Sequence, residues 1–320
     1  MATIKNHKVS DAPSVVVLGM GAMGSSLALR LLGQNIPLSI WNRSRSKCEN
    51  VVKEVGMGVQ CTIGDTAAGA IGCSKEHALV IFMLSSVDAV VGTLRDKSVQ
   101  EVLVGRTVLN LCTCNADDGR RVAAVVSEID NGKVAYIDGA YSGAPKKARA
   151  GAGQLFLSSE VEENVTRWRH VLDLLGKATF CGRLGASRAF DYAVVDLMFV
   201  NLVSFIENLN GLQREGVDLK QLYGEMSARL ATIPAALEMY EQRMRDQDEA
   251  SYEKEVTASL GVCKNYWQGR KPYSRAHGDP TMLTDFMVDL FEKASGGKDG
   301  PHSGADLSRI QEVLRYGNKD

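Results

Sequence analysis

The chain has 320 residues, of which 45% are hydrophobic and 23% are charged, and its formal net charge is −1 at pH 7. This is the balance of an ordinary globular protein long enough for two domains, and so small a charge offers no field that would draw the whole protein to nucleic acid or to an anionic membrane. No uninterrupted apolar run reaches the roughly 18 residues of a membrane-spanning helix, so we expect no membrane partner.

The first residues and the cysteines bear on the compartment. Residues 1–13 are polar and lack the apolar stretch of a secretory signal, so we interpret them as a loose tail. The seven cysteines are scattered, and the closest pair, Cys112 and Cys114, has a spacing that suits neither a zinc knuckle nor a thioredoxin-type motif. We therefore expect reduced thiols, no metal site and a cytoplasmic protein.

Short apolar runs alternate with helical patterns through the first half of the chain. Strands are expected at 14–18, 37–41, 78–84, 107–111, 134–137 and 154–157, and helices at 25–32, 46–54, 87–96, 117–130 and 161–175. Strands that alternate with helices are typical of a parallel sheet covered on both faces. The sequence therefore predicts one α/β domain over residues 14–183.

The pattern changes near residue 185. An apolar-rich stretch from Ser187 to about Glu215 contains no proline, and at 1.5 Å per residue it predicts a helix of roughly 40 Å, longer than one small domain needs. Beyond it the pattern stays helical, with no clear strand. We therefore divide the chain into a tail (1–13), the α/β domain (14–183), an interdomain helix (184–215) and a helical domain (216–320).

A glycine-rich turn, Gly19-Met20-Gly21-Ala22-Met23-Gly24, follows the first strand. Its first glycine suits a tight turn, its second lets the backbone approach a pyrophosphate, and its third lets the next helix pack closely on the sheet. Such a turn alone is a weak signal, because glycine-rich turns are common. Its place between a strand and a helix whose first N–H groups are free predicts a dinucleotide site.

The end of the second strand distinguishes the two nicotinamide cofactors. An NAD enzyme usually carries Asp or Glu there for the ribose 2′-hydroxyl, whereas this chain has Asn42-Arg43-Ser44-Arg45-Ser46-Lys47. Arg43 and Ser44 would bind a 2′-phosphate through charge-assisted hydrogen bonds. A solvated basic turn would explain the charges but not the missing acid. We therefore predict NADPH as the cofactor, bound here by Asn42, Arg43, Ser44 and Lys47.

Several motifs, taken in order, resemble the β-hydroxyacid dehydrogenase superfamily, and especially its imine reductase and reductive aminase branch. The glycine turn followed by Trp41-Asn42-Arg43-Ser44 begins the series. The series continues with Phe82–Ser86, Asn110–Asn115, Asp138–Pro145, Gly304–Ser308 and Tyr316–Asn318. None of these motifs is specific by itself, but their order from about residue 14 to 318 is.

The resemblance implies a fold and an assembly. It implies an N-terminal Rossmann domain, a long interdomain helix and an all-α C-terminal dimerisation domain, with the helical domains of a homodimer interlocked. Each active site then lies between the Rossmann domain of one subunit and the helical domain of the other. The apolar interdomain helix agrees with this, because so apolar a helix must be buried against something.

The resemblance also implies hydride transfer from C4 of the nicotinamide to the carbon of a C=N or C=O bond of a small imine or ketone. The dehydrogenase branch has a lysine early in the long helix, and alignment through Gly185–Tyr192 places Asp191 there, as in many imine reductases. A carboxylate can pair with an iminium or a protonated amine, whereas lysine suits anionic hydroxyacids. We predict Asp191 as the catalytic residue; the alternative is an ordinary carboxylate near a helix N-terminus.

The other expected site residues also follow from the resemblance. Many imine reductases with this aspartate have a tyrosine about two turns on, where this chain has Phe199, so the proton path or the substrate differs. Asp196 lies on another face of the helix, about 140° from Asp191. The residues expected at the substrate are Tyr141, Ser142 and Phe199, and those expected at the cofactor, besides the glycine turn and the basic segment, are Leu84, Ser85 and Thr113.

Three functions are compatible with these patterns. The first is an NADPH-dependent reductase of C=N bonds. The second is a β-hydroxyacid dehydrogenase-like oxidoreductase of carbonyls or alcohols, which the replacement of lysine by Asp191 disfavours. The third is an NADP-binding protein without catalysis, to which the replacement of tyrosine by Phe199 gives some weight.

Overall fold

The computed structural model describes residues 14–56, 58–246, 256, 258–297 and 300–316. The chain divides into two compact units, Met1–Leu197 and Met198–Asp320. The tail expected over residues 1–13 and the end of the C-terminal motif, Gly317 and Asn318, lie outside the described residues.

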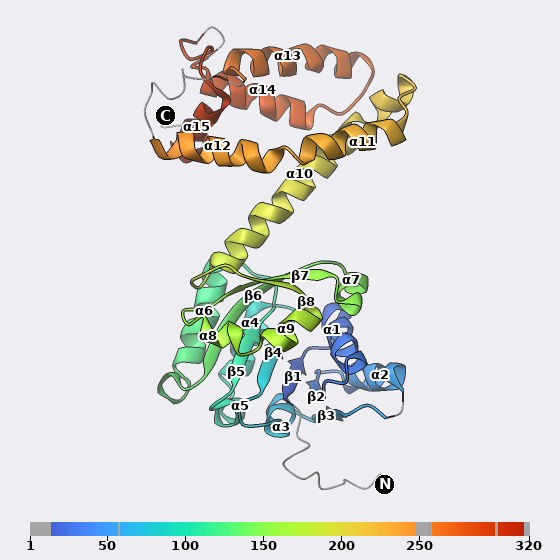
Figure 1. Ribbon diagram of the computed structural model, residues 1–320, viewed down its shortest axis with the longest axis vertical. Coiled ribbons are helices and arrows are strands. Elements are labelled where there is room, and N and C mark those ends of the chain that lie inside the picture. The colour runs from blue at the N-terminus through green and yellow to red at the C-terminus, as the bar shows by residue number, and fades with distance from the viewer. Residues whose placement is uncertain (1–13, 57, 247–255, 257, 298–299, 317–320) are drawn as a thin grey trace. The chain divides into compact units, whose positions relative to one another are not determined.

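The first unit is built on an eight-stranded sheet in the order β3-β2-β1-β4-β5-β6-β7-β8 (Figure 1). The first six strands thus have the Rossmann order. The strands are β1 (Val15–Leu18), β2 (Leu38–Trp41), β3 (Cys61–Ile63), β4 (Leu79–Phe82), β5 (Thr107–Asn110), β6 (Ala135–Ser142), β7 (Gly153–Ser158) and β8 (Gly176–Phe180). All six strands expected from the sequence are confirmed, and β3 and β8 are additional.

Helices cover both faces of this sheet, as expected. They are α1 (Ala22–Gly33), α2 (Arg45–Val55), α3 (Ala67–Gly72), α4 (Val87–Leu94), α5 (Lys97–Leu103), α6 (Ala116–Ser127), α7 (Pro145–Ala150), α8 (Glu163–Thr166) and α9 (Arg169–Leu175), with a 3-10 turn η2 (Ile129–Gly132). The helix expected over 161–175 is two helices. The break falls at Trp168, whose backbone is not helical and whose side chain is buried in the core.

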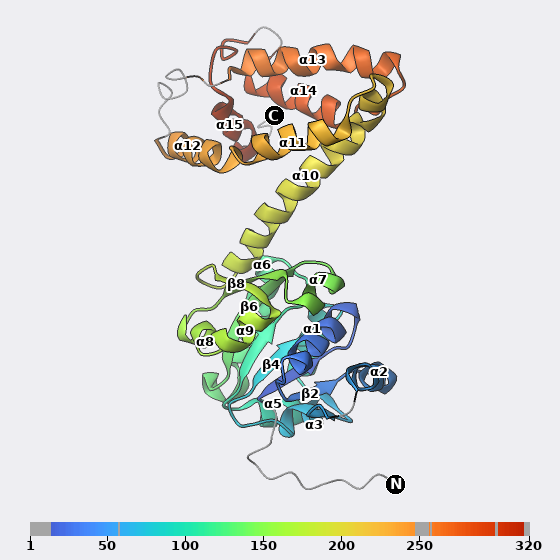
Figure 2. The same ribbon diagram turned by 45° about the vertical axis from the view of Figure 1, so that its right-hand side comes forward.

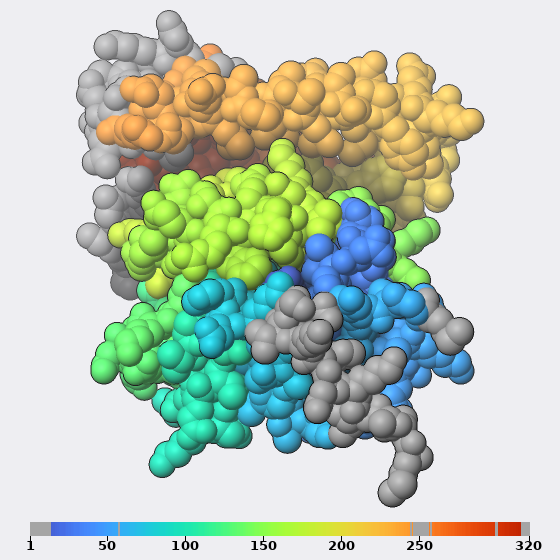
Figure 3. Space-filling view, turned by 60° about the horizontal axis from the view of Figure 1, so that its bottom comes forward, coloured from blue at the N-terminus to red at the C-terminus, as the bar shows by residue number. Residues whose placement is uncertain are grey.

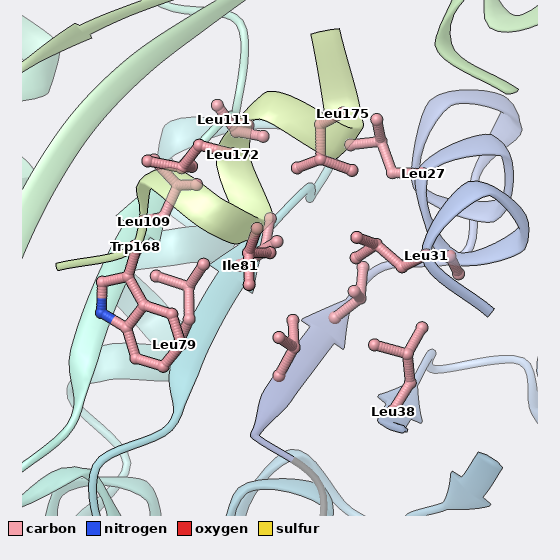
Figure 4. Packing of buried hydrophobic residues seen from close by; sticks show 14 of the residues in the cluster. Leu27, Leu31, Leu38, Leu79, Ile81, Leu109, Leu111, Trp168, Leu172 and Leu175 are labelled. Atoms are coloured by element: carbon pink, nitrogen blue, oxygen red, sulfur yellow. The ribbon is translucent and has the colours of Figure 1, made fainter. Parts of the chain in front are cut away.

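The alternation of side chains along β1 explains the two layers of the core. Val15 and Val17 point into a cluster shared with α1, α2 and α9, whereas Val16 and Leu18 point into a cluster shared with α3, α4, α5 and α6. All four side chains are fully buried, as a strand between two helical layers requires. Figure 4 shows the first cluster, where leucines of α1, leucines of α9 and Trp168 pack on one face of the sheet, with Leu175 beside Leu27. On the surface, the yellow-green region of α8 and α9 lies beside the blue α1 (Figure 3).

One expectation about the sheet is wrong. Strands β1 to β6 are parallel, but β7 is antiparallel to β6, and β8 is parallel to β7. Only ten residues join β6 to β7, and α7 takes six of them. A parallel crossover needs a dozen or more residues, so this connection is too short to return β7 in the direction of β6. The sheet therefore has a mixed edge.

The expected long helix is α10 (Ala186–Arg214), drawn as one continuous helix in Figures 1 and 2. The division between the two units falls within it. By length and composition alone, α10 is one helix of the described chain that could cross a membrane.

The second unit is helical in the part of the chain that the structure describes, apart from an isolated bridge between Ser259 and Asp306. A small core of Leu260, Phe291, Ala294 and Ala305 holds it together. Its elements after α10 are α11 (Leu219–Leu230), α12 (Ile233–Asp246), α13 (Leu260–Ala276), α14 (Met282–Ala294), η4 (Leu307–Arg309) and α15 (Ile310–Tyr316). Helices α13 and α14 lie side by side (Figure 2).

Candidate functional site

The glycine turn joins β1 to α1, and its three glycines meet different surroundings. Gly19 has φ +104°, and a Cβ there would lie 2.3 Å from the carbonyl oxygen of Met83. A Cβ at Gly24 would lie 1.8 Å from the carbonyl oxygen of Gly19. A Cβ at Gly21 would meet no atom within 4 Å. The fold therefore requires Gly19 and Gly24, whereas Gly21 borders open space, as the approach of a pyrophosphate would require.

Asn42 ties this turn to the end of β2. Its side-chain oxygen accepts the Met20 N–H at 3.0 Å, and its side-chain nitrogen donates to the Ser44 carbonyl at 3.1 Å. The Gly19 N–H donates to the Trp41 carbonyl at 2.8 Å. The predicted cofactor residue Asn42 thus also braces two segments between which a cofactor would bind.

The basic residues after β2 are not equivalent. Arg45 is held by Glu49, at 3.2 Å, and by Asp65. The exposed side chains of Arg43 and Lys47 have no ion-pair partner within the described ranges. Two cations that are free to meet a phosphate therefore flank one that is neutralised, and this arrangement fits a 2′-phosphate.

The expected residues after β4 and β5 belong to the same edge of the sheet. Leu84 and Ser85 follow β4, and Thr113 follows β5; Ser85 and Thr113 are exposed, and Leu84 is half-buried. Because β1, β4 and β5 are neighbouring parallel strands, these loops leave the sheet where the glycine turn does. This is the switch point at which open α/β sheets bind ligands.

Two residues of this edge that the sequence analysis missed form a buried ion pair. Asp138 lies in β6 and Arg188 in the first turn of α10; their Oδ1 and Nη2 atoms are 2.8 Å apart, and their side chains are 0% and 3% exposed. Burial acts to lower the pKa of the Arg188 guanidinium, but the hydrogen bonds and the charge of Asp138 outweigh it, and the pKa is raised. The two residues are 50 positions apart, and no local pattern marks them as partners.

Asp191 lies three residues after Arg188 on α10, and its side chain is half-buried. Its Oδ1 is inaccessible to solvent and accepts no hydrogen bond from any described residue. Burial raises the pKa of this carboxyl, and the charge of Arg188 acts in the opposite direction. A buried acceptor without a donor is costly, so the Asp191 carboxyl is under-satisfied within the described chain.

The other predicted substrate residues have different surroundings. The Tyr141 hydroxyl donates to the Leu175 carbonyl at 2.9 Å, and its ring packs on the first core cluster, so this hydroxyl already has an acceptor. Ser142 ends β6 and is half-buried. Phe199 is 53% exposed and lies in the part of α10 that belongs to the second unit. Asp196 is exposed.

The first unit thus brings together the glycine turn, the basic segment after β2, the loops after β4 and β5, and Asp191. The anchor of Arg188 on β5 and β6 places the first turns of α10 at this same edge. The geometry fits a dinucleotide along the glycine turn. The Tyr141 hydroxyl is engaged by the Leu175 carbonyl, and Phe199 belongs to the second unit, so their place at the substrate stays a prediction.

Comparison with known proteins agrees with this arrangement. Residues 14–183, more than half of the chain, match the family model described as the NAD binding domain of 6-phosphogluconate dehydrogenase. An NADPH-dependent reductive aminase of Aspergillus oryzae is 24% identical over 94% of this chain and 97% of its own length.

A glyoxylate/succinic semialdehyde reductase of Arabidopsis thaliana is 25% identical over 69% of this chain, and the match covers 59% of that relative. Among solved structures, an imine reductase from Aspergillus terreus in complex with NADPH4 has a TM-score of 0.79 at 22% identity, covering 94% of this chain and 99% of that one. These likenesses confirm the expected fold over both units of the chain.

Proposed function

Because the chain belongs to the family of the NAD binding domain of 6-phosphogluconate dehydrogenase, we propose that it is an NADPH-dependent reductase that transfers hydride to the carbon of a C=N bond in a small imine or iminium ion. The observation that carries the substrate class is the half-buried Asp191 carboxyl, whose Oδ1 has no donor among the described residues. A protonated C=N nitrogen is the kind of donor with which such a carboxylate pairs.

NADPH is the cofactor that the site fits best. When bound, it supplies the hydride from C4 of its nicotinamide. The glycine turn offers open space at Gly21 and the N-terminus of α1 to the phosphates. Arg43 and Lys47, which have no ion-pair partner among the described residues, offer positive charge to a 2′-phosphate. One relative is named as NADPH-dependent, and one structural neighbour is named as a complex with NADPH4.

Asp191 is proposed to hold the substrate nitrogen and to exchange a proton with it. Burial raises the pKa of the carboxyl, and the shift makes proton transfer near neutral pH easier than for an exposed aspartate. A lysine at this position would repel an iminium, whereas the carboxylate attracts it. The same charge disfavours the anionic substrates that hydroxyacid dehydrogenases use.

We also propose that two chains form a homodimer with interlocked helical domains. In the single chain α10 exposes many large apolar side chains, including Met198, Val200, Val203 and Ile206, each more than half exposed. An apolar surface of this extent is typical of an interface, and the helix must be buried against something. The occupant that we propose is a second copy; a membrane is the other possible occupant, and a cytoplasmic location stays a prediction.

The proposed reaction is tested by following NADPH oxidation with a panel of substrates at fixed protein concentration. The panel contains cyclic imines, ketones with and without an added amine, and 2-oxo and semialdehyde acids. Turnover of imines at the highest kcat/KM is the expected result. Preference for the keto acids would replace the proposal with a hydroxyacid dehydrogenase-like activity, which the glyoxylate reductase relative makes the second candidate. NADPH binding without turnover of any substrate would favour the non-catalytic alternative.

A further inference from the structure

We propose that Arg188 and Asp138 are a positioning pair. Buried together, they hold the first turns of α10 against the sheet and set the electrostatic potential at Asp191. This inference rests on the proposed function, because Asp191 is the residue on which the pair acts. Neither Arg188 nor Asp138 touches the reacting atoms in this proposal.

The geometry of the pair is a two-point fork. Arg188 Nη2 lies 2.8 Å from Asp138 Oδ1, and Arg188 Nε lies 3.1 Å from Asp138 Oδ2. The same Nη2 donates to the Asn110 carbonyl at 3.2 Å, at the end of β5. Bidentate pairing fixes the orientation of both groups as well as their distance, so α10 cannot turn or slide at this point without breaking it.

Hydrogen-bond donors from several elements satisfy the Asp138 carboxylate. The Tyr136 hydroxyl at 3.3 Å, the Asn110 side-chain nitrogen at 3.4 Å and the Ser187 hydroxyl at 3.4 Å all reach it. On α6, Gly119 leaves room for it, since a Cβ there would lie 2.5 Å from Asp138 Oδ2. The pair therefore joins α10 to β5 and β6, the strands that lead into the proposed nicotinamide side of the site.

The electrostatic effect on Asp191 follows from helix geometry. Residues three apart lie on one helix face with Cβ atoms roughly 5–6 Å apart, and Arg188 is the charged group whose field acts on Asp191. Apart from Asp138, the titratable groups that other elements place around Arg188 are neutral near pH 7: burial raises the pKa of Cys112 and Tyr136, and raises that of Cys114 to about 11. The charge of Asp118 on α6 raises the pKa of both cysteines further.

Position, rather than stability alone, explains why the pair is charged. Burying two ions costs desolvation that their attraction only partly repays, and apolar residues of similar volume often stabilise a core as well or better. A charged fork is specific in its geometry, however, and it leaves a cation one turn from Asp191. A structural role would need only the packing, whereas the proposed role needs the charges.

The two charges predict shifts of opposite sign, which makes the test specific. Arg188→Gln removes the cation and leaves the Asp138 carboxylate unbalanced, so the pKa of Asp191 should rise. Asp138→Asn leaves the Arg188 guanidinium unbalanced, so the pKa of Asp191 should fall. We expect each shift to be at least about half a pH unit. The double variant Asp138→Asn/Arg188→Gln should lie between the two.

The titration of Asp191 can be measured directly by carbon-13 NMR of the carboxyl groups in the NADPH-bound protein, with the signal assigned by its loss in Asp191→Asn. The pH profile of kcat/KM provides the second readout: the limb lost in Asp191→Asn should move up in Arg188→Gln and down in Asp138→Asn. Arg120→Gln is the control. It removes an arginine that pairs with Asp117 and reaches Leu184 near the start of α10, and it should move neither readout.

Opposite shifts in the two single variants, with Arg188→Lys close to the wild type in titration and below it in kcat, support the proposal. Equal or like-signed shifts overturn it. If a single variant does not fold, as thermal unfolding and NADPH affinity will report, the double variant and Arg188→Lys carry the test, because both should titrate near the wild type but have a lower kcat; a wild-type kcat in both would overturn the proposal. Full activity of Asp191→Asn would instead reject the proposed role of Asp191, and the NMR titration would still decide whether the pair sets its charge.

Discussion

At Asp191, two effects on one carboxyl oppose each other: burial raises its pKa and the Arg188 guanidinium lowers it. The balance keeps the group able to change protonation state closer to neutral pH than an exposed aspartate. Below its pKa the group can donate a proton, and above it the group can hold a cationic nitrogen. Both states would serve the proposed reduction of a C=N bond.

We expect Asp191→Asn to lower kcat on the best imine by roughly 10² or more, the usual range for the loss of a positioned acid–base group. NADPH affinity should stay the same, because the side chain is similar in size and the cofactor contacts are elsewhere. Stopped-flow oxidation of NADPH and a binding titration measure the two. Asp196→Asn, five residues on and exposed, is the matched control and should keep most of the activity; near-full turnover of Asp191→Asn would assign the proton transfer to another donor.

The unequal arginines after β2 permit a second test. Arg43→Ala should weaken NADPH binding at least about tenfold relative to NADH, near 1.4 kcal/mol, because one charge-assisted contact to the 2′-phosphate is lost. Arg45→Ala removes the same charge from the neighbouring turn, but that charge already pairs with Glu49 and Asp65, so its effect should be smaller. Dissociation constants of both cofactors for the three proteins measure the difference. Equal wild-type affinities for NADPH and NADH would reject the assignment.

At the scale of elements, sequence patterns predicted the strands and helices that depend mainly on neighbouring residues. Val15–Leu18 is β-branched and apolar, and it is the fully buried central strand that this composition indicates. β3 has three half-buried residues and too short a pattern to recognise. The reversal at β7 depends on the length of the connection, and the Asp138–Arg188 pair joins residues 50 positions apart. Sequence patterns carry no direct signal for such long-range partners.

In the glycine turn, the fold requires two glycines and the expected ligand requires the third. Gly24→Ala should lower the melting temperature by several degrees, because its Cβ would lie 1.8 Å from the Gly19 carbonyl oxygen and such overpacking costs roughly 1–3 kcal/mol. Gly21→Ala should melt like the wild type, because Gly21 has φ −72° and open space around it, yet it should bind NADPH at least about tenfold more weakly. Thermal unfolding without cofactor and NADPH titration distinguish the two. Equal melting temperatures for both variants, or wild-type affinity in Gly21→Ala, would contradict this account.

At the scale of the molecule, the candidate site of the first unit contains a cofactor edge and the Asp191 carboxyl. Phe199, which was expected at the substrate, belongs to the second unit. The sequence predicted the dinucleotide turn, the basic segment and Asp191 because each is a local motif or a position in a family pattern. It could not predict which residues enclose the substrate, since that depends on how units and chains pack.

Whether two chains assemble therefore decides which residues enclose the substrate. We expect a stable dimer at micromolar concentration by light scattering, with an interface of about 2,000 Å² or more, as is common for obligate dimers. Ile206→Glu adds a charge where the single chain is 59% exposed. On a free surface it should change stability by less than about 0.5 kcal/mol. In a buried interface it should instead dissociate or aggregate the protein and remove imine turnover. Val161→Glu, at a position 49% exposed in the first unit, is the control and should leave both unchanged. A wild-type monomer would contradict the dimer, and co-sedimentation of that monomer with lipid vesicles would identify the membrane as the occupant of the apolar surface of α10.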